Sequence, residues 1–136
     1  MRALLIKSGR KHAVYALASR SRCEVLDVIE KLMTDDRKTA EKFLAVIERF
    51  SEGEAVYQGA IKSLKDGIYE FRCNRRGHWL RVLWFYDENN GRVVICTHAF
   101  IKKSNETPKG EIRKARDLLR AYKEARRSGD VEFIEE

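Results

Sequence analysis

The chain has 136 residues, of which 43% are hydrophobic and 36% are charged. A chain of this length buries about two thirds of its unfolded surface, so it needs no disulfide or bound metal to fold. One proline and eight glycines exclude a collagen-like or low-complexity protein. No apolar run approaches the roughly 20 residues of a transmembrane helix. We therefore expect a soluble, cytoplasmic, single-domain protein without a cofactor and without a membrane partner.

The net charge of +7 is distributed unevenly along the chain. Residues 56–129 carry seventeen basic and eight acidic side chains, whereas residues 23–55 carry five basic and nine acidic ones. Such polarisation favours a surface that faces a polyanion, and nucleic acid is the polyanion we favour. The alternative is that the basic side chains simply solvate the outer faces of helices.

Two short apolar runs, Ala3–Ile6 and Ala13–Leu17, precede the first helix signal. Either run could form a strand, and we favour the second because it leads directly into that signal. The signal is the segment Ser21–Glu24, a capping box in which the serine hydroxyl and the glutamate carboxylate satisfy free backbone amides.

Two apolar stripes at helical spacing follow the capping box. The first consists of Val25, Leu26, Ile29, Leu32 and Met33, and the second of Ala40, Phe43, Leu44, Ile47 and Phe50. The segment Thr34–Asp36 ends the first helix and caps the second. This short connection predicts an antiparallel helical hairpin.

After Gly53 the apolar residues alternate with polar ones, as strands require. Three strands are expected, over Ile68–Cys73, Trp79–Tyr86 and Arg92–Phe100. The turn-like segments between them predict an antiparallel meander. Thr107 as N-cap and Pro108 as first residue begin a last, basic helix that ends before Ser128. The six residues after Asp130 form an acidic tail or a short extra strand, and the fold class is α+β.

Arg81 is the most informative charged residue because it interrupts the apolar run from Trp79 to Phe85. A charge in such a strand is costly unless it is paired or lies at a surface. A salt bridge to Glu70 or Asp87 would explain it, and so would the binding of a phosphate, which suits a forked guanidinium.

The three histidines and three cysteines indicate little chemistry. His98 is the best candidate for acid–base work, although a hydrogen-bonded core histidine is the more common case. Cys96 and His98, two apart on one strand, should point the same way and suggest nucleophilic catalysis only weakly. Neither set has metal-ligand spacing, so we expect no metal site, and the cysteines are expected to be free thiols.

Several motifs occur in the order found in one known family. They are Leu64–Arg72 (LKDGIYEFR), Leu80–Phe85 (LRVLWF), His98–Lys109 (HAFIKKSNETPK) and the pair Glu111-Ile112. Together they resemble the HigB-like, phage-derived branch of the RelE/ParE toxin superfamily of type II toxin–antitoxin systems. The upstream helical hairpin also fits that family's order of elements.

The resemblance implies a RelE-like fold, in which a small antiparallel meander packs against an N-terminal helical hairpin and a basic helix follows. It divides the chain into an N-terminal extension (residues 1–11), a toxin domain (12–127) and an acidic tail (128–136). It also implies a metal-independent endoribonuclease, an mRNA interferase that inhibits translation by cleaving mRNA in the ribosomal A site. The implied partners are mRNA, the ribosome and a cognate antitoxin, expected to be a helix-turn-helix repressor. We predict that the antitoxin covers the basic face, because an acidic or apolar segment over Arg81 and the lysine pair Lys102-Lys103 would block RNA entry.

The resemblance assigns roles to residues by their place in the motifs. Arg81 matches the strand arginine that contacts the scissile phosphate, while Lys102 and Lys103 match a basic strand-end position. The resulting catalytic candidates are Arg81, Lys103, Glu70 and His98. The RNA-binding candidates are Arg72, Lys102, Phe100, Trp79 and Lys109.

This sequence departs from the best-known ribosome-dependent members at two points. Glu70 stands where they have a lysine, and their C-terminal catalytic tyrosine is absent, since Tyr122 lies on an apolar stripe and is expected in the core. The general base therefore stays open between Glu70 and His98. Alternative functions are a ParE-like gyrase inhibitor, a non-catalytic phage-derived nucleic-acid-binding protein, and a degenerate toxin that still binds its antitoxin.

Overall fold

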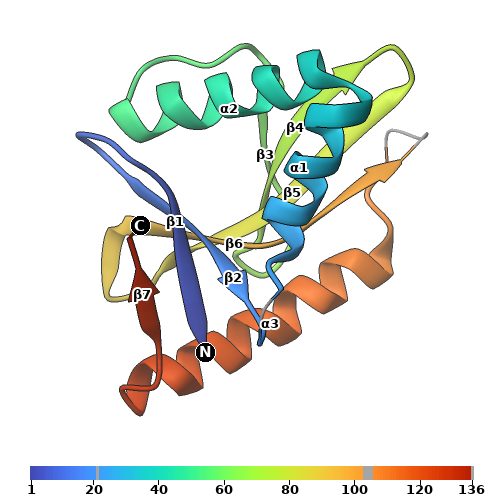
Figure 1. Cartoon of the computed structure of the whole chain (residues 1–136). Coiled ribbons are helices and arrows are strands. Elements are labelled where there is room, and N and C mark those ends of the chain that lie inside the picture. The colour runs from blue at the N-terminus through green and yellow to red at the C-terminus, as the bar shows by residue number, and fades with distance from the viewer. Residues whose placement is uncertain (21, 103–105, 136) are drawn as a thin grey trace.

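A computed structural model of the chain describes residues 1–20, 22–102 and 106–135. The elements in chain order are β1 (Arg2–Ser8), β2 (Ala13–Ala18), α1 (Glu24–Asp35), α2 (Arg37–Glu52), β3 (Ile61–Ser63), β4 (Tyr69–Arg75), β5 (His78–Asp87), β6 (Asn90–Lys102), α3 (Lys109–Arg127) and β7 (Glu132–Ile134). The strands form one mixed sheet in the order β3-β4-β5-β6-β2-β1-β7. Helices α1 and α2 cover one face of this sheet and α3 covers the other (Figure 1).

The α+β class is confirmed, but the predicted small antiparallel sheet behind an N-terminal helical hairpin is wrong. The described residues form a seven-stranded sheet, and the chain begins with the strands β1 and β2 before the hairpin of α1 and α2. Strand β2 pairs with β1 in antiparallel and with β6 in parallel orientation. All six of its residues are buried, because it lies between two helical layers and is apolar throughout.

The helical hairpin is confirmed, with a cap at the predicted connection. The Asp36 carboxylate accepts hydrogen bonds from the Thr39 amide at 3.4 Å and the Thr39 hydroxyl at 2.6 Å, which satisfies the start of α2. At the start of α1 the N-cap is Cys23, whose side chain makes no capping hydrogen bond. Ser21, the serine of the predicted capping box, lies outside the described residues.

On the other face, α3 buries Ala115 and Tyr122 against the sheet, which confirms Tyr122 as a core residue. The N-cap of α3 is Pro108 rather than the predicted Thr107, because the Thr107 hydroxyl donates its hydrogen bond to Glu70 instead. The segment after α3 adds β7 to the sheet, parallel to β1. None of the helices in the described ranges combines the length and apolar character needed to cross a membrane.

A β-bulge near the middle of β6 changes which side chains share a face. Leu83 of β5 lies opposite His98, but its neighbour Trp84 lies opposite Cys96, so Thr97 is an extra residue. Cys96 consequently faces the α1/α2 layer, whereas His98 faces α3 and bonds to it. The expectation that Cys96 and His98 point the same way is therefore wrong.

Candidate functional site

Nine side chains on the α3 side of β4, β5 and β6 form three rows across the sheet, which we call the meander grid. Strand register places them directly opposite one another, so they share one face. The rows are Glu70–Leu83–His98, Arg72–Arg81–Phe100 and Asn74–Trp79–Lys102. The grid therefore contains every predicted site residue except Lys109 and Lys103, and Lys103 lies outside the described residues.

Glu70 is the carboxylate of the grid and is fully buried. Its Oε2 accepts a hydrogen bond of 2.6 Å from the Thr107 hydroxyl. Its Oε1 lies 3.3 Å from the Nε atom of Arg72 and 3.8 Å from that of Arg81. The Oε1 atom accepts no hydrogen bond from the described residues, so both contacts are ion pairs, and the nearer arginine takes the larger share of the anion.

Arg81 is also fully buried, and its guanidinium is only partly satisfied. Its Nη1 donates to the Asn74 side-chain oxygen at 2.6 Å and to the Leu80 carbonyl at 3.0 Å. Its Nη2 has no hydrogen-bond partner among the described residues. Burial lowers the pKa of Arg81, repulsion from Arg72 lowers it further, and Glu70 opposes both.

The two salt-bridge partners considered for Arg81 have different outcomes. Glu70 is within ion-pair distance of Arg81, as one alternative required. Asp87 instead accepts hydrogen bonds from the Tyr122 hydroxyl at 2.5 Å and from Arg126 at 2.9 Å. The ion pair with Glu70 thus accounts for part of the charge compensation of Arg81. It does not account for the burial of the Nη2 atom without a hydrogen-bond partner among the described residues.

Lys102 adds a third cation to the grid. Burial lowers the pKa of its ammonium group, and repulsion from Arg81 and Arg72 adds to this effect, while Glu70 opposes it. Within the described part of the chain its Nζ atom is buried without a hydrogen-bond partner. Three cations around one carboxylate leave an excess of positive charge, which is the electrostatic condition for binding an anion.

His98 is a hydrogen-bonded core histidine, 2% exposed. Its Nδ1 lies 2.9 Å from the Thr97 hydroxyl and its Nε2 lies 3.1 Å from the carboxylate of Glu111. Burial and the nearby Lys114 lower the pKa of His98, although Glu111 opposes them. Both ring nitrogens are therefore occupied, and a substrate would have to displace one of these bonds to use them.

The aromatic candidates lie beside the charged ones. The ring of Trp79 is 5.8 Å from the Arg81 guanidinium carbon, and Phe100 stacks on His98 with ring centroids 5.7 Å apart. Both aromatic residues are half-buried. Lys109 is exposed at the first residue of α3.

Two contributors were missed by reasoning from the sequence, namely Thr107 and Asn74. Thr107 belongs to the motif His98–Lys109 but is expected to cap a helix, and Asn74 lies in the turn-like segment between the first two expected strands. Their hydrogen bonds to Glu70 and Arg81 depend on tertiary structure, so local patterns do not indicate them. In the ranges that the structure describes, no three His, Cys, Asp or Glu side chains gather as a metal site requires.

Comparison with curated proteins found no match to the chain. A family model described as phage derived protein Gp49-like (DUF891) matches residues 27–120, well over half of the chain. The matched region contains all three strands of the meander grid and Thr107. This family is associated with RelE/HigB-like toxins. The chain is a member of the Gp49-like family of phage-derived proteins.

Proposed function

We propose that this chain is the toxin of a type II toxin–antitoxin system and acts as a ribosome-dependent mRNA endoribonuclease. The observation that supports the proposal best is the meander grid, where Arg72, Arg81 and Lys102 surround the single carboxylate of Glu70. Membership of the Gp49-like family supports the toxin assignment. Its partners would be mRNA, the ribosome and an antitoxin.

The reaction we propose is attack of an RNA 2′-oxygen on the adjacent phosphorus. A bond forms between this oxygen and phosphorus, and the bond from phosphorus to the 5′-oxygen of the next nucleotide breaks. A general base takes the 2′-hydroxyl proton and the leaving 5′-oxygen takes a proton from water, so the products are a 2′,3′-cyclic phosphate and a 5′-hydroxyl. Negative charge grows on the phosphoryl oxygens in the transition state, and fixed cations such as Arg81 and Lys102 stabilise it there.

Access to the cations follows from their burial. Arg81 is fully buried, while the Arg72 side chain is 15% exposed. A phosphate would therefore meet Arg72 first, and the unpartnered Nη2 atom of Arg81 would support it from below. Trp79 and Phe100, half-buried in the same rows, would offer aromatic faces for an unpaired base, and the exposed Lys109 would contact the RNA backbone.

Glu70 is the better candidate for the general base that takes the 2′-hydroxyl proton. Both ring nitrogens of His98 already have protein partners, whereas the carboxylate of Glu70 keeps lone pairs beyond its bond to Thr107. A positioned base of this kind contributes about 10²–10⁴-fold to rate. We assign His98 the role of holding β6 against α3.

The test is primer extension on an mRNA translated in a purified bacterial system. The wild-type chain should produce new 5′ ends only when the mRNA is translated. Arg81→Lys keeps the positive charge but removes the forked guanidinium group. Lys102→Ala removes the ammonium group, which has no hydrogen-bond partner among the described residues. Each variant should slow cleavage by about 10²–10³-fold. Lys123→Ala is the matched control and should cleave normally, because this α3 side chain is 41% exposed and pairs only with Glu88 among the described residues.

Two outcomes would contradict the proposal. Unchanged cleavage by both grid variants would place the site elsewhere. Absence of translation-dependent cleavage by the wild-type chain would remove the ribonuclease assignment, and inhibited DNA supercoiling would then favour a gyrase-directed toxin.

A further inference from the structure

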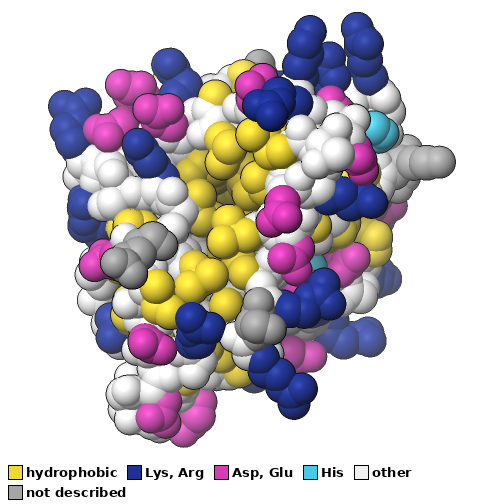
Figure 2. All heavy atoms as spheres, in the orientation of Figure 1, with side chains coloured by type: hydrophobic (Ala, Val, Ile, Leu, Met, Phe, Trp, Pro, Cys, Tyr) yellow, Lys and Arg dark blue, Asp and Glu magenta, His cyan; other side chains and the backbone are white. Residues whose placement is uncertain are grey.

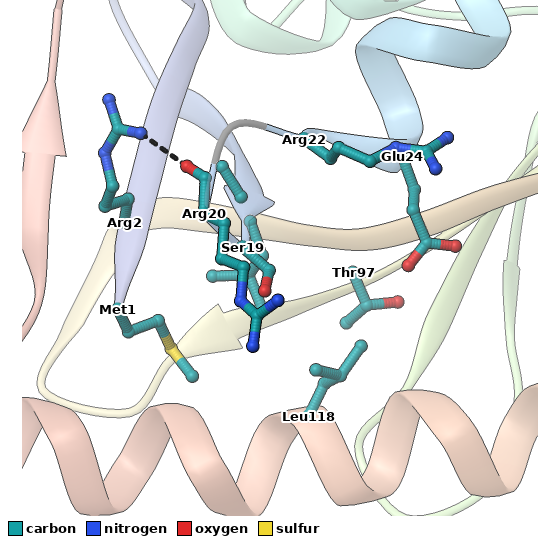
Figure 3. Close-up of a pocket in the computed structure, with 10 residues that line it drawn as sticks. Met1, Arg2, Ser19, Arg20, Arg22, Glu24, Thr97 and Leu118 are labelled. Atoms are coloured by element: carbon teal, nitrogen blue, oxygen red, sulfur yellow. Dashed lines mark hydrogen bonds between the residues drawn. The ribbon is translucent and has the colours of Figure 1, made fainter.

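A cavity of about 1040 Å³ opens between the adjoining ends of β1 and β2, the start of α1 and the middle of α3 (Figure 3). None of the nine grid residues belongs to its described lining. The two sites are in contact through Thr97, which lines the cavity and whose hydroxyl lies 2.9 Å from the Nδ1 atom of His98. The function proposed for the grid therefore leaves this cavity without a role.

The described lining combines an apolar floor with basic side chains. Leu17 and Leu118 contribute apolar surface, and Arg2, Arg20 and Arg22 contribute positive charge. The acidic side chain in this lining, Glu24, already binds the Lys114 ammonium at 2.7 Å. The cavity is therefore electropositive as well as apolar.

The backbone conformation of Arg20 directs its side chain into the cavity (Figure 3). Its φ of 57° lies in the left-handed region, which is uncommon for arginine. Reciprocal backbone hydrogen bonds between Ser19 and Arg22 close this turn, and Arg2 donates to the Arg20 carbonyl at 2.8 Å. Figure 3 shows the Arg20 side chain extending between Met1 and Leu118.

An apolar strip adjoins the cavity on the same side of the molecule. Figure 2 shows apolar side chains gathered in the middle of this face, with charged side chains around them. Leu4 and Ile6 of β1 are only partly buried against the α1/α2 core. The floor beside them on β2 is made of small residues, Ala16 and Ala18. Exposed apolar surface with a charged rim is typical of a protein-binding site.

We propose that this cavity and the adjoining strip bind a segment of a partner protein that is both acidic and apolar. Aspartate or glutamate side chains of the segment would pair with Arg20 and Arg2, and its apolar side chains would cover Leu17, Leu118 and the strip. The volume is at the upper limit of small-molecule sites, which are about 300–1,000 Å³. None of the described lining residues is aromatic, so the cavity lacks the aromatic side chains on which single-stranded bases commonly stack.

The experiment selects peptides from a random 12-residue phage-displayed library on the immobilised full chain. We expect the enriched peptides to combine an excess of Asp and Glu with regularly spaced apolar residues. A synthetic consensus peptide should then bind the chain in a fluorescence anisotropy titration. Arg20→Glu should raise its Kd by about tenfold or more, because the reversed charge repels the acidic side chains.

Arg113→Glu makes the same charge change at an exposed position of α3 outside the described lining and should leave the Kd unchanged. A second cavity variant, Leu118→Ala, should weaken binding severalfold by removing apolar contact. Failure to enrich peptides, a consensus without acidic residues, or equal binding by Arg20→Glu and Arg113→Glu would each overturn the proposal. Competition by an oligouridine RNA that itself loses affinity for Arg20→Glu would identify the cavity as an RNA site instead.

Discussion

Glu70 carries the electrostatic balance of the meander grid, because the buried side chains around its carboxylate are mainly cations. Two arginines lie within 3.8 Å of its Oε1 atom, and Lys102 is close enough for its pKa to be affected by Glu70. Arg72 and Arg81 are also directly opposite one another on β4 and β5. Like charges in that relation destabilise a sheet unless a counter-charge separates them.

Glu70→Gln should therefore lower the free energy of unfolding by about 3–5 kcal/mol, the cost typical of removing one partner from a buried ion pair. Glutamine can keep the hydrogen bond from Thr107, so the loss would be one of charge. Urea denaturation measures the change, and Glu30→Gln, at an exposed position of α1, is the control. Added sulfate should restore part of the stability of Glu70→Gln only.

An unchanged stability of Glu70→Gln would show that the cations need no counter-charge, which would contradict the excess of positive charge inferred for the grid. Loss of stability without any effect of sulfate would confine the grid to a structural role. The pair of measurements thus separates the structural contribution of Glu70 from the capacity of the grid to bind an anion.

At the residue scale, the sequence identified most residues of the meander grid but few of the contacts between them. Arg81 was singled out because a charge in an apolar strand requires a partner, and the grid supplies Glu70 and Asn74. The opposite case is His12, which was not selected as a site residue. It is 8% exposed and stacks on Phe50, a contact between residues far apart in the chain that no local pattern encodes.

At the scale of elements, the turn between β1 and β2 is hydrogen-bonded to the end of α2. The Ser51 carbonyl accepts hydrogen bonds from the amides of Lys11 and His12, both at 2.9 Å. Gly9 lies in the same turn, and a Cβ atom added to it would come 2.4 Å from the Ser51 carbonyl oxygen. The absence of a side chain at Gly9 is what allows the strand turn to approach the helix.

We expect Gly9→Ala to destabilise the fold by about 1–3 kcal/mol, as overpacking usually does. Gly91→Ala is the matched control, since a Cβ there meets nothing within 4 Å, and it should have no unfavourable effect on stability. Thermal unfolding of both variants measures the difference. Equal melting temperatures would mean that the hairpin can move away from α2 at no cost.

Sequence patterns predicted the individual elements well and their arrangement less well. The two helices and the three meander strands depend on local apolar spacing and caps, such as Asp36, and all are present. The parallel pairing of β2 with β6 joins segments about 80 residues apart, and apolar alternation does not specify a partner strand. The bulge at Thr97 likewise places Cys96 and His98 on opposite faces, because one extra residue shifts the alternation.

At the scale of the whole molecule, the two layers on either side of the sheet each contain a buried histidine. His12 lies in the α1/α2 layer, with its ring 4.4 Å from that of Phe50 and nearly parallel to it. His98 lies on the α3 side and bonds to Glu111. Burial is the largest cause of a lowered pKa in both, and the charges of Lys11 and Lys114, respectively, lower it further.

These lowered pKa values predict that the free energy of unfolding decreases at acidic pH, with a contribution from the histidine in each layer. A histidine whose pKa is lower in the folded state than its ordinary 6.5 binds a proton more readily when unfolded. Its contribution to stability is therefore complete above pH 6.5 and is lost as the pH falls below that value. The free energy of unfolding should decrease between pH 7.5 and 5.5, by at most about 1.4 kcal/mol per pH unit for each histidine.

His12→Phe isolates one of the two contributions, because phenylalanine keeps the stacking on Phe50 and does not titrate. Urea denaturation at pH 7.5 and 5.5 gives the change in the free energy of unfolding with pH for the variant and for the wild-type chain. In the difference between these two slopes, the contributions of all other titrating groups cancel. The variant should lose less stability on acidification than the wild-type chain. Identical slopes would show that His12 protonates equally well folded and unfolded, which would leave the stack on Phe50 with a packing role alone.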